Sequence, residues 1–576
     1  MRSFRQFALA RLAVALVAGA LVAAACAPTT PTGGGTAPPQ AGKPTPGGRV
    51  IVGSFADAKV LNPVLINDTA SRTAGYRLYE PLVIPNAKTA NIEPRLAEKF
   101  EVSADNQTIT FTLRDGLKWS DGSAFTGEDF KFTAQAVMRS KATVRQNIFQ
   151  DIVGAKDYKD GKAEDISGIT VSGKTITVQL AKAFCPGITA IGNFYIIPKS
   201  EFGKYMDPKD ASKNIDNAPE NTKPVLSMGP FKFKEWIPND HITLARNDNF
   251  FLGKPYLDEW VMKISPNSDA AVAALKTGEI DAFAIEAKDL EDVKKVDTLN
   301  FFSYLAPGYT YIGWNQLRGG KEFFQSKAVR QALAYGVDMQ QVIDKIVFGE
   351  GKKMVSHTPP VSWAYDPSGL NDYKYDAAKA EQLLQQDGWT KGSDGVYQKG
   401  GQKLEFSIVT NSGNKTRETL LQVAVEQYKK IGVSATAKTE SFEALVDRLT
   451  KSKDPKYGEQ GGHDYDAVII GWSLGTDPDA YSIWHSSQLK GGFDFVGYNN
   501  ATVDKTLEDG RTKCSQAERK AAYKAFDKQL NEDQPYNFGF AANTLLFVNK
   551  RVQGVDPGPF GLDLSLWNAD KWWVKQ

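Results

Sequence analysis

The chain has 576 residues with a formal net charge of +2, and 41% of its residues are hydrophobic. Removing the three arginines of the first 25 residues lowers the net charge from +2 to −1, so the remaining body is nearly neutral. A neutral body argues against a nucleic-acid partner, because nucleic-acid-binding domains carry a marked excess of Lys and Arg. The chain is also too long for one hydrophobic core, which predicts two or more lobes.

Residues 1–25 have the pattern of a bacterial targeting signal. A basic start precedes Leu12–Ala25, an apolar run too short for an ordinary transmembrane helix. Small residues followed by Cys26 end the run, which resembles the lipobox of bacterial lipoproteins, with Ala23 where that motif usually has leucine. The resemblance implies a lipid on Cys26, and the alternative is a plain secretory signal with a nearby cleavage site.

A tether of 26–48 follows the signal. It is rich in Pro, Thr and Gly and lacks a core-forming run. A flexible segment directly after an anchor would let a folded body stand away from a membrane. No later apolar run approaches the length of a membrane span. We therefore expect an extracytoplasmic body, in the periplasm or at the cell surface, that is anchored to the membrane through Cys26.

The first part of the folded body contains two predicted strands and a capped helix. Val50–Phe55 predicts a strand, and Thr108–Leu113 alternates apolar side chains with threonines, which predicts a strand with one buried face. Thr126 with Asp129 three residues later predicts a helix that runs to about Arg139. A hydroxyl cap and an early acidic residue both stabilise a helix N-terminus.

The remainder of the body alternates strands with helices. The predicted strands are Lys174–Leu180, Ile242–Leu244, Ala282–Ile285, Tyr309–Asn315, Leu404–Thr410 and Val433–Thr439. The predicted helices are Ser268–Thr277, Ser326–Asp338, Gln340–Phe348, Ala377–Gln386, Thr416–Ile431 and Phe442–Leu449. This alternation is typical of an α/β fold.

The segment Asp464–Ser487 places polar and aromatic groups at one predicted strand end. Ala467–Ile470 predicts a buried strand. Asp477 before Pro478 predicts a helix that starts there, with the aspartate as N-cap. Open α/β sheets bind their ligands at such junctions. We therefore expect a binding site around Trp472.

The residues Gly471-Trp472-Ser473-Leu474-Gly475 also match the G-x-S-x-G nucleophile elbow of hydrolases. A catalytic triad would need a histidine after the serine, and among the four histidines only His485 follows Ser473. His485 is one short predicted helix away, too close to return from a separate strand. We expect a protein without catalytic residues and keep a secreted serine hydrolase that uses Ser473 as the alternative of a different class.

An ordered set of short motifs resembles one family. The motifs are L-N-P at 61–63, Y-E-P-L at 79–82, P-x-L-A-E at 94–98, F-x-L-R-x-G-x-x-W-x-D-G at 111–122, T-x-E-D at 126–129, G-P-F at 229–231, G-E-I-D at 278–281, V-R-Q-A-L at 329–333 and G-W at 471–472. Their order resembles the family 5 extracellular solute-binding proteins, the peptide- and nickel-binding lipoproteins or periplasmic proteins that serve ABC importers. The resemblance covers essentially the whole body after the tether.

The resemblance implies an α/β, two-lobed fold of the periplasmic-binding-protein kind, class II type, with an extra subdomain in lobe one. The implied division is lobe I at 49–305 with the subdomain at about 86–220, lobe II at 306–532, and a return to lobe I at 533–576. Hinge strands would lie near 303–312 and 532–541. A monomer would close its lobes on a ligand and deliver it to ABC permease subunits.

Aromatic and polar residues near predicted strand ends or in loops are the expected ligand contacts. The aromatic candidates are Tyr309, Trp314, Trp363, Trp472 and Trp484. Their faces suit both sugar rings and apolar side chains. The polar candidates are Asn315, Asn411, Arg417, Ser473 and Asp477. Dipeptide-binding relatives carry an arginine in the neighbourhood of Arg417 that meets the ligand carboxylate.

The expected ligand follows from one departure from the family pattern. Peptide-binding relatives often hold the free α-amine with an aspartate three residues after the Trp of G-W, and this chain has Gly475 there. Asp477 is expected to be occupied as a helix cap. The sequence therefore favours oligopeptides longer than three residues, gripped through their backbone, and leaves neutral oligosaccharides as the alternative.

No cofactor or metal is expected. The histidines are isolated, without H-x₃₋₅-H or H-E-x-x-H spacing, and the chain lacks a Gly-rich phosphate loop. Apart from Cys26, the cysteines are Cys185 and Cys514. They lie far apart in the sequence, so a disulfide between them is possible but not expected.

Overall fold

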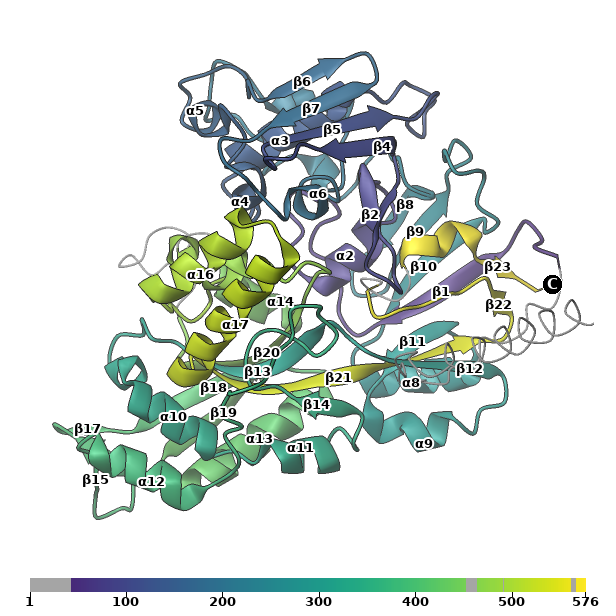
Figure 1. Ribbon diagram of the computed structural model, residues 1–576. Coiled ribbons are helices and arrows are strands. Elements are labelled where there is room, and N and C mark those ends of the chain that lie inside the picture. Colours follow the sequence, from purple (N-terminus) through teal and green to yellow (C-terminus); the bar gives the residue numbers. More distant parts are fainter. Residues whose placement is uncertain (1–42, 452–463, 490–491, 561–565, 576) are drawn as a thin grey trace, which may run out of the picture. The chain divides into compact units, whose positions relative to one another are not determined.

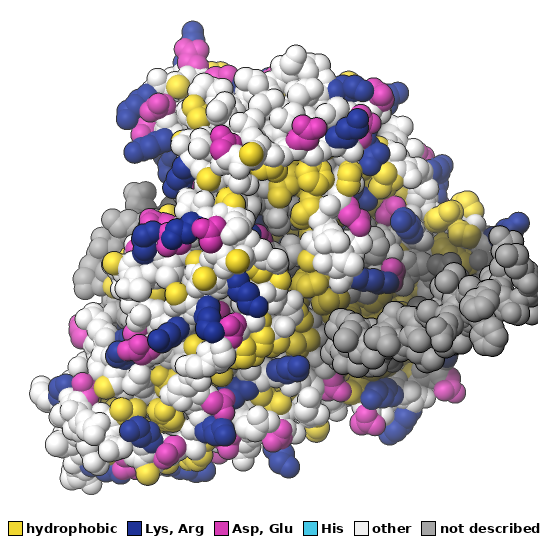
Figure 2. All heavy atoms as spheres, viewed as in Figure 1, with side chains coloured by type: hydrophobic (Ala, Val, Ile, Leu, Met, Phe, Trp, Pro, Cys, Tyr) yellow, Lys and Arg dark blue, Asp and Glu magenta, His cyan; other side chains and the backbone are white. Residues whose placement is uncertain are grey.

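The computed structural model describes residues 43–451, 464–489, 492–560 and 566–575. The predicted signal segment, Cys26 and the tether up to residue 42 lie outside these residues. No helix within the described ranges has the length and apolar character needed to cross a membrane. On the face shown in Figure 2, basic and acidic side chains are intermingled, in keeping with the nearly neutral composition.

A mixed sheet forms the centre of the fold and contains twelve strands of the described ranges. Its order is β19-β18-β20-β13-β21-β11-β1-β10-β9-β8, and β12 and β14 also pair with β21. The bounds are β1 (Arg49–Ser54), β8 (Phe231–Ile237), β9 (His241–Arg246), β10 (Glu259–Ile264), β11 (Ala282–Ile285), β12 (Leu299–Leu305), β13 (Gly308–Trp314), β14 (Gly351–Lys353), β18 (Glu405–Asn411), β19 (Ser434–Glu440), β20 (Ala467–Ser473) and β21 (Tyr536–Asn549).

Strand β21 connects the two parts of this sheet. Its first residues pair with β13, whereas Leu545–Val548 pair with β11 and Asn543–Asn549 pair with β12. Figure 1 shows it as a long yellow strand that runs past β13 and β14 toward β11 and β12. Most of its side chains are buried, as expected for a strand covered on both faces.

A smaller antiparallel sheet lies at the top of Figure 1, beside helix α3 (Gly127–Arg139). Its strands, in spatial order, are β4 (Ala97–Val102), β5 (Thr108–Leu113), β7 (Thr175–Gln179) and β6 (Ile169–Ser172). The predicted strand and helix are confirmed here. β5 alternates between half-buried and buried residues, and Thr126 with Asp129 forms a reciprocal capping box on α3.

Small sheets and helices complete the fold. The short strands are β2 (Val83–Pro85), β3 (Ile92–Pro94), β15 (Thr390–Lys391), β16 (Tyr397–Lys399), β17 (Gln402–Lys403), β22 (Val552–Gln553) and β23 (Trp573–Val574). The further helices are α2 (Thr69–Gly75), α4 (Gln146–Phe149), α5 (Ala155–Lys159), α6 (Gly187–Ala190), α7 (Lys199–Phe202), α8 (Ser268–Thr277), α9 (Leu290–Val293), α10 (Lys327–Tyr335), α11 (Met339–Lys345), α12 (Ala377–Gln386), α13 (Lys415–Lys430), α14 (Phe442–Lys451), α15 (Tyr481–Trp484), α16 (Ala501–Thr512) and α17 (Gln516–Asp533).

Cys185 and Cys514 form a disulfide, with their Cα atoms 5.0 Å apart. The sequence left this bridge possible but did not favour it, and the structure contains it. Cys185 lies between β7 and α6, and Cys514 lies between α16 and α17, so elements separated by 329 residues meet here. The backbone N–H of Cys185 also donates to the carbonyl of Arg511 at 2.7 Å. Sequence separation gave no sign of this proximity.

Candidate functional site

Two adjoining hollows, of about 380 Å³ and about 250 Å³, form one cleft. They share lining residues that include Arg145, Asn193, Gly475, Asp479 and Phe493. The larger hollow alone falls within the volume range typical of small-ligand sites. Its walls come from distant parts of the chain, which we call the N-terminal wall (lining residues 55–76, 145–148 and 189–195) and the C-terminal wall (lining residues 417–495).

Helix α2 builds much of the N-terminal wall. Asp68 caps this helix, since its carboxylate accepts from the backbone N–H and the hydroxyl of Ser71 at 2.8 Å and 2.6 Å. Arg72 lies on the helix, Tyr76 directly follows its last residue, and both line the cleft. The Tyr76 ring stacks on Tyr195, with ring centroids 4.0 Å apart. The cap and the stacked rings therefore hold both Arg72 and Tyr76 at the cleft surface.

The end of β20 builds the C-terminal wall around Trp472. The indole ring lies between Tyr311, at 6.0 Å between ring centroids, and Phe495, at 5.1 Å, and both pairs are stacked. Phe493 meets it edge-on at 5.7 Å. Trp472, Phe493 and Phe495 line the cleft, while Tyr311 is fully buried behind them. This wall offers an apolar, aromatic surface to a ligand.

Arg417 reaches the cleft from the first turn of α13. Its Nη1 donates to Asn411 Oδ1 at 2.8 Å, and burial lowers the pKa of the guanidinium to about 10, so it stays protonated at neutral pH. A Cβ at Gly471 would lie 3.0 Å from Arg417 Nη2, closer than ordinary contacts allow. The same Cβ would lie 3.0 Å from the backbone oxygen of Tyr309, so the glycine of the G-W pair fits a space bounded by the neighbouring strand and by this arginine.

Contacts across the cleft show that the two walls are closed on each other. The Nη2 of Arg72 donates to the Oγ of Ser473 at 3.0 Å, and Lys59 forms an ion pair with Asp447. Phe55 and Phe442 meet edge-on, with ring centroids 6.3 Å apart. In a closed arrangement a ligand is surrounded on both sides.

Asp477 and Asp479 are each bound by an arginine. Asp477 accepts from Arg519 at 2.6 Å and 2.9 Å, and Asp479 accepts from Arg511 at 2.7 Å and 3.0 Å. The predicted helix start at Asp477 is wrong, because α15 begins at Tyr481. Instead, Asp477 Oδ1 accepts from the backbone N–H of Asp479 at 3.0 Å, inside a loop. The carboxylate of Asp477 is therefore engaged as expected, but by Arg519 and by a backbone N–H of the loop, not by a helix N-terminus.

The chain matches the family described as "Bacterial extracellular solute-binding proteins, family 5 Middle" over residues 91–493. It is 32% identical over 585 residues to the oligopeptide-binding protein AppA of Bacillus subtilis, covering 99% of both chains. The chain is a family 5 solute-binding protein. The lactococcal oligopeptide-binding protein OppA (Lactococcus lactis subsp. cremoris) is 29% identical, with 78% of this chain and 77% of that protein covered.

Solved structures of family 5 proteins share the fold. The structure of Bacillus subtilis AppA in complex with a nonapeptide matches with a TM-score of 0.82 at 31% identity, covering 93% of this chain and 100% of that one. Lactococcal OppA, complexed with an endogenous peptide in the closed conformation, matches with a TM-score of 0.79 at 26% identity, covering 92% and 100%. The predicted family and the two-lobed α/β fold are thereby confirmed.

Membership in a family of binding proteins agrees with the surroundings of Ser473. This serine is the last residue of β20, and its Oγ accepts from Arg72. The ring of His485 stacks on Tyr481 and its Nδ1 lies 2.8 Å from Ser487 Oγ. A serine nucleophile needs a base within hydrogen-bonding reach, and His485 is engaged elsewhere. The family 5 protein is a binding protein, not a hydrolase.

Of the predicted ligand contacts in this family 5 protein, Arg417, Trp472, Ser473 and Asp477 line the cleft. Asn411 is fully buried and acts behind Arg417 as its hydrogen-bond acceptor. These residues come together because the start of α13 and the end of β20 meet at the same end of the sheet.

Five other predicted contacts line neither hollow. The hydroxyl of Tyr309 and the indole N–H of Trp484 both lie within 2.9 Å of His357 Nδ1, and burial lowers the pKa of this histidine to about 3. Trp363 packs edge-on against Tyr523, beneath the guanidinium of Arg519. These groups stabilise the layer behind the cleft.

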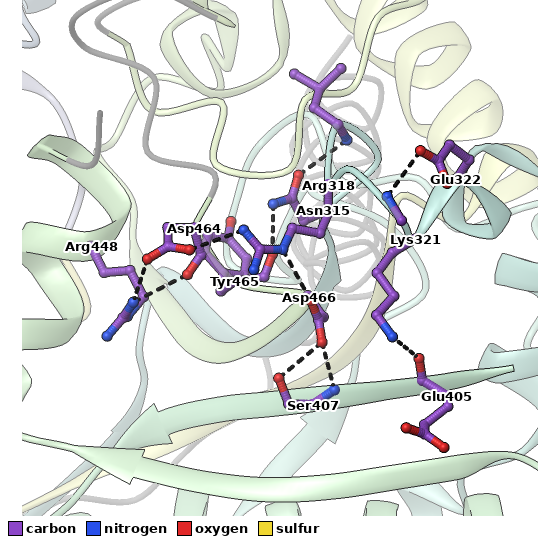
Figure 3. A network of polar contacts seen from close by, with 12 residues as sticks. Asn315, Arg318, Lys321, Glu322, Glu405, Ser407, Arg448, Asp464, Tyr465 and Asp466 are labelled. Atoms are coloured by element: carbon purple, nitrogen blue, oxygen red, sulfur yellow. Dashed lines mark hydrogen bonds and ion pairs between the residues drawn. The ribbon is translucent and has the colours of Figure 1, made fainter. Parts of the chain in front are cut away.

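Trp314 and Asn315 lie at the opposite end of β13 from the cleft, about 20 Å along the strand. Trp314 is fully buried among aromatic rings. Asn315 donates to the carbonyl of Tyr465 at 2.7 Å, and Figure 3 shows it within a polar network that includes Arg318 and Asp466. The sequence correctly predicted the strand but not which of its ends faces the cleft.

Sequence patterns gave no indication of the N-terminal wall as a whole. Arg72, Tyr76, Arg145 and Tyr195 occupy separate segments without a shared motif, and they meet only in the fold. The one local sign of this wall in the sequence was Asp68, a residue type that favours the N-cap position of a helix. In the described part of the chain, no group of three or more His, Cys, Asp or Glu residues could hold a metal ion.

Proposed function

We propose that this protein captures oligopeptides in the cleft between its two walls and delivers them to the membrane subunits of an ABC importer. The observation that carries the proposal is the closed cleft, lined by a buried arginine and an aromatic wall, in a chain that aligns along its whole length with an oligopeptide-binding protein. The nonapeptide in the AppA structure supports a peptide rather than a single amino acid as the ligand class.

The backbone of a peptide has a place to bind beside β20. This strand pairs with β18 only at Ala467 and Val468, and among the described residues no strand pairs with that edge of residues 470–473. A peptide can add to a free strand edge through main-chain hydrogen bonds, which do not depend on its sequence. Arg417, next to this edge, would receive a ligand carboxylate as a charge-assisted partner.

We further propose that the two lobes move relative to each other and that a lipid anchors the protein to the membrane. Residues 306–532 move as one lobe against 49–305 and 533–576, with the hinge where β12 continues into β13 and where β21 passes between them. The ligand enters the open form and the walls close on it. The lipid on Cys26 and the tether 26–48 keep the protein at the outer face of the membrane, which raises its effective concentration near the permease.

Native mass spectrometry of residues 49–576, as purified and after unfolding and refolding, tests this function. Peptides released from the purified protein, and rebinding of synthetic peptides after refolding, would support it. A sugar adduct would instead favour the oligosaccharide alternative, which the stacked rings of Trp472 and Phe495 also suit. A refolded protein that binds neither peptides nor sugars would contradict the proposal.

A further inference from the structure

The charged groups of the cleft do not balance. Its carboxylates already have cationic neighbours: Asp477 is bound by Arg519, and Asp479 by Arg511. Asp68, which caps α2, has both oxygens occupied, since they accept from the backbone N–H and the hydroxyl of Ser71. No carboxylate of the cleft therefore remains for the α-amine of a peptide, among the residues that the structure describes.

Two arginines of the cleft, in contrast, contact only neutral oxygens. Arg145 donates from Nε and Nη2 to the carbonyl of Ile66 at 3.1 Å and 2.8 Å. Arg417 donates to the amide oxygen of Asn411. Within the described ranges, neither guanidinium has a carboxylate at ion-pair distance. Glu286 influences Arg417 electrostatically, and its carboxylate accepts from the backbone N–H of Thr416.

The two arginines lie in separate parts of the cleft. Arg417 lines the larger hollow from the C-terminal wall, whereas Arg145 lines both hollows from the N-terminal wall. An ordinary peptide carries one terminal carboxylate and can satisfy one of them. The other would stay enclosed in the cleft without a counter-charge, which is costly when water is excluded.

We propose that the cleft selects acidic peptides, with Arg417 and Arg145 each binding one carboxylate of the ligand. The inference rests on the proposed function and specifies its ligand class. A peptide with an acidic side chain supplies the second negative charge, and guanidinium–carboxylate pairs are stronger than pairs with neutral oxygens. Because no carboxylate is left for the α-amine, acetylation of the peptide N-terminus should be tolerated.

Isothermal titration with two matched seven-residue peptides tests the inference. Both consist of alanine and leucine, and they carry either two glutamates or two glutamines at the same positions. We expect the glutamate peptide to bind the wild type at least tenfold more tightly. N-acetylation of this peptide should change its Kd less than threefold. Equal or weaker binding of the glutamate peptide would overturn the inference alone, and failure of both peptides to bind would overturn the proposed function with it.

The variant Arg145→Gln tests whether Arg145 is responsible for the preference for the glutamate peptide. The variant should bring the two affinities to within about threefold of each other, because it removes the partner of the second ligand carboxylate. Arg114→Gln is the matched control, because Arg114 also donates to one backbone carbonyl, that of Arg95, but lies outside the cleft. A preference for the glutamate peptide that survives in Arg145→Gln would overturn the role of Arg145.

Discussion

Asp494 is a buried acid whose two oxygens have different surroundings. Its Oδ1 accepts the backbone N–H groups of Val496, Gly497 and Tyr498 at 3.3 Å, 2.9 Å and 3.2 Å. Its Oδ2 is buried and has no hydrogen-bond partner in the described part of the chain. Burial raises the pKa of this carboxyl from 3.8 to about 8, so it is largely protonated at neutral pH.

Asp494→Asn should flatten the pH dependence of stability between pH 5 and pH 8. The folded state of the wild type holds one more proton than the unfolded state in this range. The stability from Asp494 is therefore present below pH 3.8 and is lost as the pH rises through about 8, by up to about 1.4 kcal/mol per pH unit. Urea unfolding of both proteins at pH 5, 6.5 and 8 measures the difference. Identical slopes would contradict the prediction.

Trp472→Ala should weaken peptide binding by roughly 30-fold, the loss expected for a central aromatic contact. The indole ring forms the face of the C-terminal wall between Tyr311 and Phe495. Titration with a bound peptide measures the effect, and Trp314→Phe, at the far end of β13, is the matched control. A Trp472→Ala protein that remains folded and binds peptide as tightly as the wild type would show that the wall is not a binding surface.

At the residue scale, the sequence located one wall of the cleft and not the other. Trp472, Ser473 and Arg417 could be predicted because each lies at an element end or beside a family motif. Arg72 and Arg145 could not, because only the fold brings their segments together. Asp477 was predicted to be occupied, but its partner Arg519 lies 42 residues further along the chain, beyond the reach of local rules.

At the scale of helices and strands, local sequence signals predicted the first and last residues of several elements well. Helix α3 begins after Thr126 because cap, acidic residue and apolar spacing agree, and α8 and α12 have the predicted bounds. The helix expected to start at Pro478 does not form there, because the ion pair of Asp477 with Arg519 competes with the use of Asp477 as a helix cap. Arg519 and Arg511 fix the loop 474–480 against α16 and α17 by binding its two aspartates.

Arg519→Met should destabilise the protein by about 3 kcal/mol, because it leaves the carboxylate of Asp477 largely buried without its counter-charge. The double variant Asp477→Asn with Arg519→Met removes both charges and should recover much of the loss. Denaturant unfolding of the two single variants and the double variant gives the coupling between the residues. Strictly additive effects would show that the pair is not coupled.

At the scale of the whole molecule, strand pairing and a disulfide connect the two walls at separate places among the described residues. One is the region where β12, β13 and β21 run together, and the other is the disulfide between Cys185 and Cys514. Two bodies fixed at two separate points can rotate only about the line through them. The disulfide should therefore limit how the cleft opens, a constraint that sequence patterns could not indicate.

The double variant Cys185→Ser with Cys514→Ser should open further than the wild type. We expect a larger radius of gyration in solution scattering of the ligand-free protein, and faster peptide release in stopped-flow fluorescence. Treating the wild type with a reducing agent should reproduce both changes, whereas the same treatment of the double variant should have no effect. Unchanged scattering and release rates in the variant would show that the bond does not restrain opening.

The disulfide also changes the covalent topology of the chain. It closes a ring between residues 185 and 514 that contains the whole C-terminal wall. A single proteolytic cut anywhere within that ring leaves one covalent molecule. A nicked protein would therefore migrate as a single band without reductant and as two fragments with it, and it would keep both walls of its cleft attached in an oxidising environment.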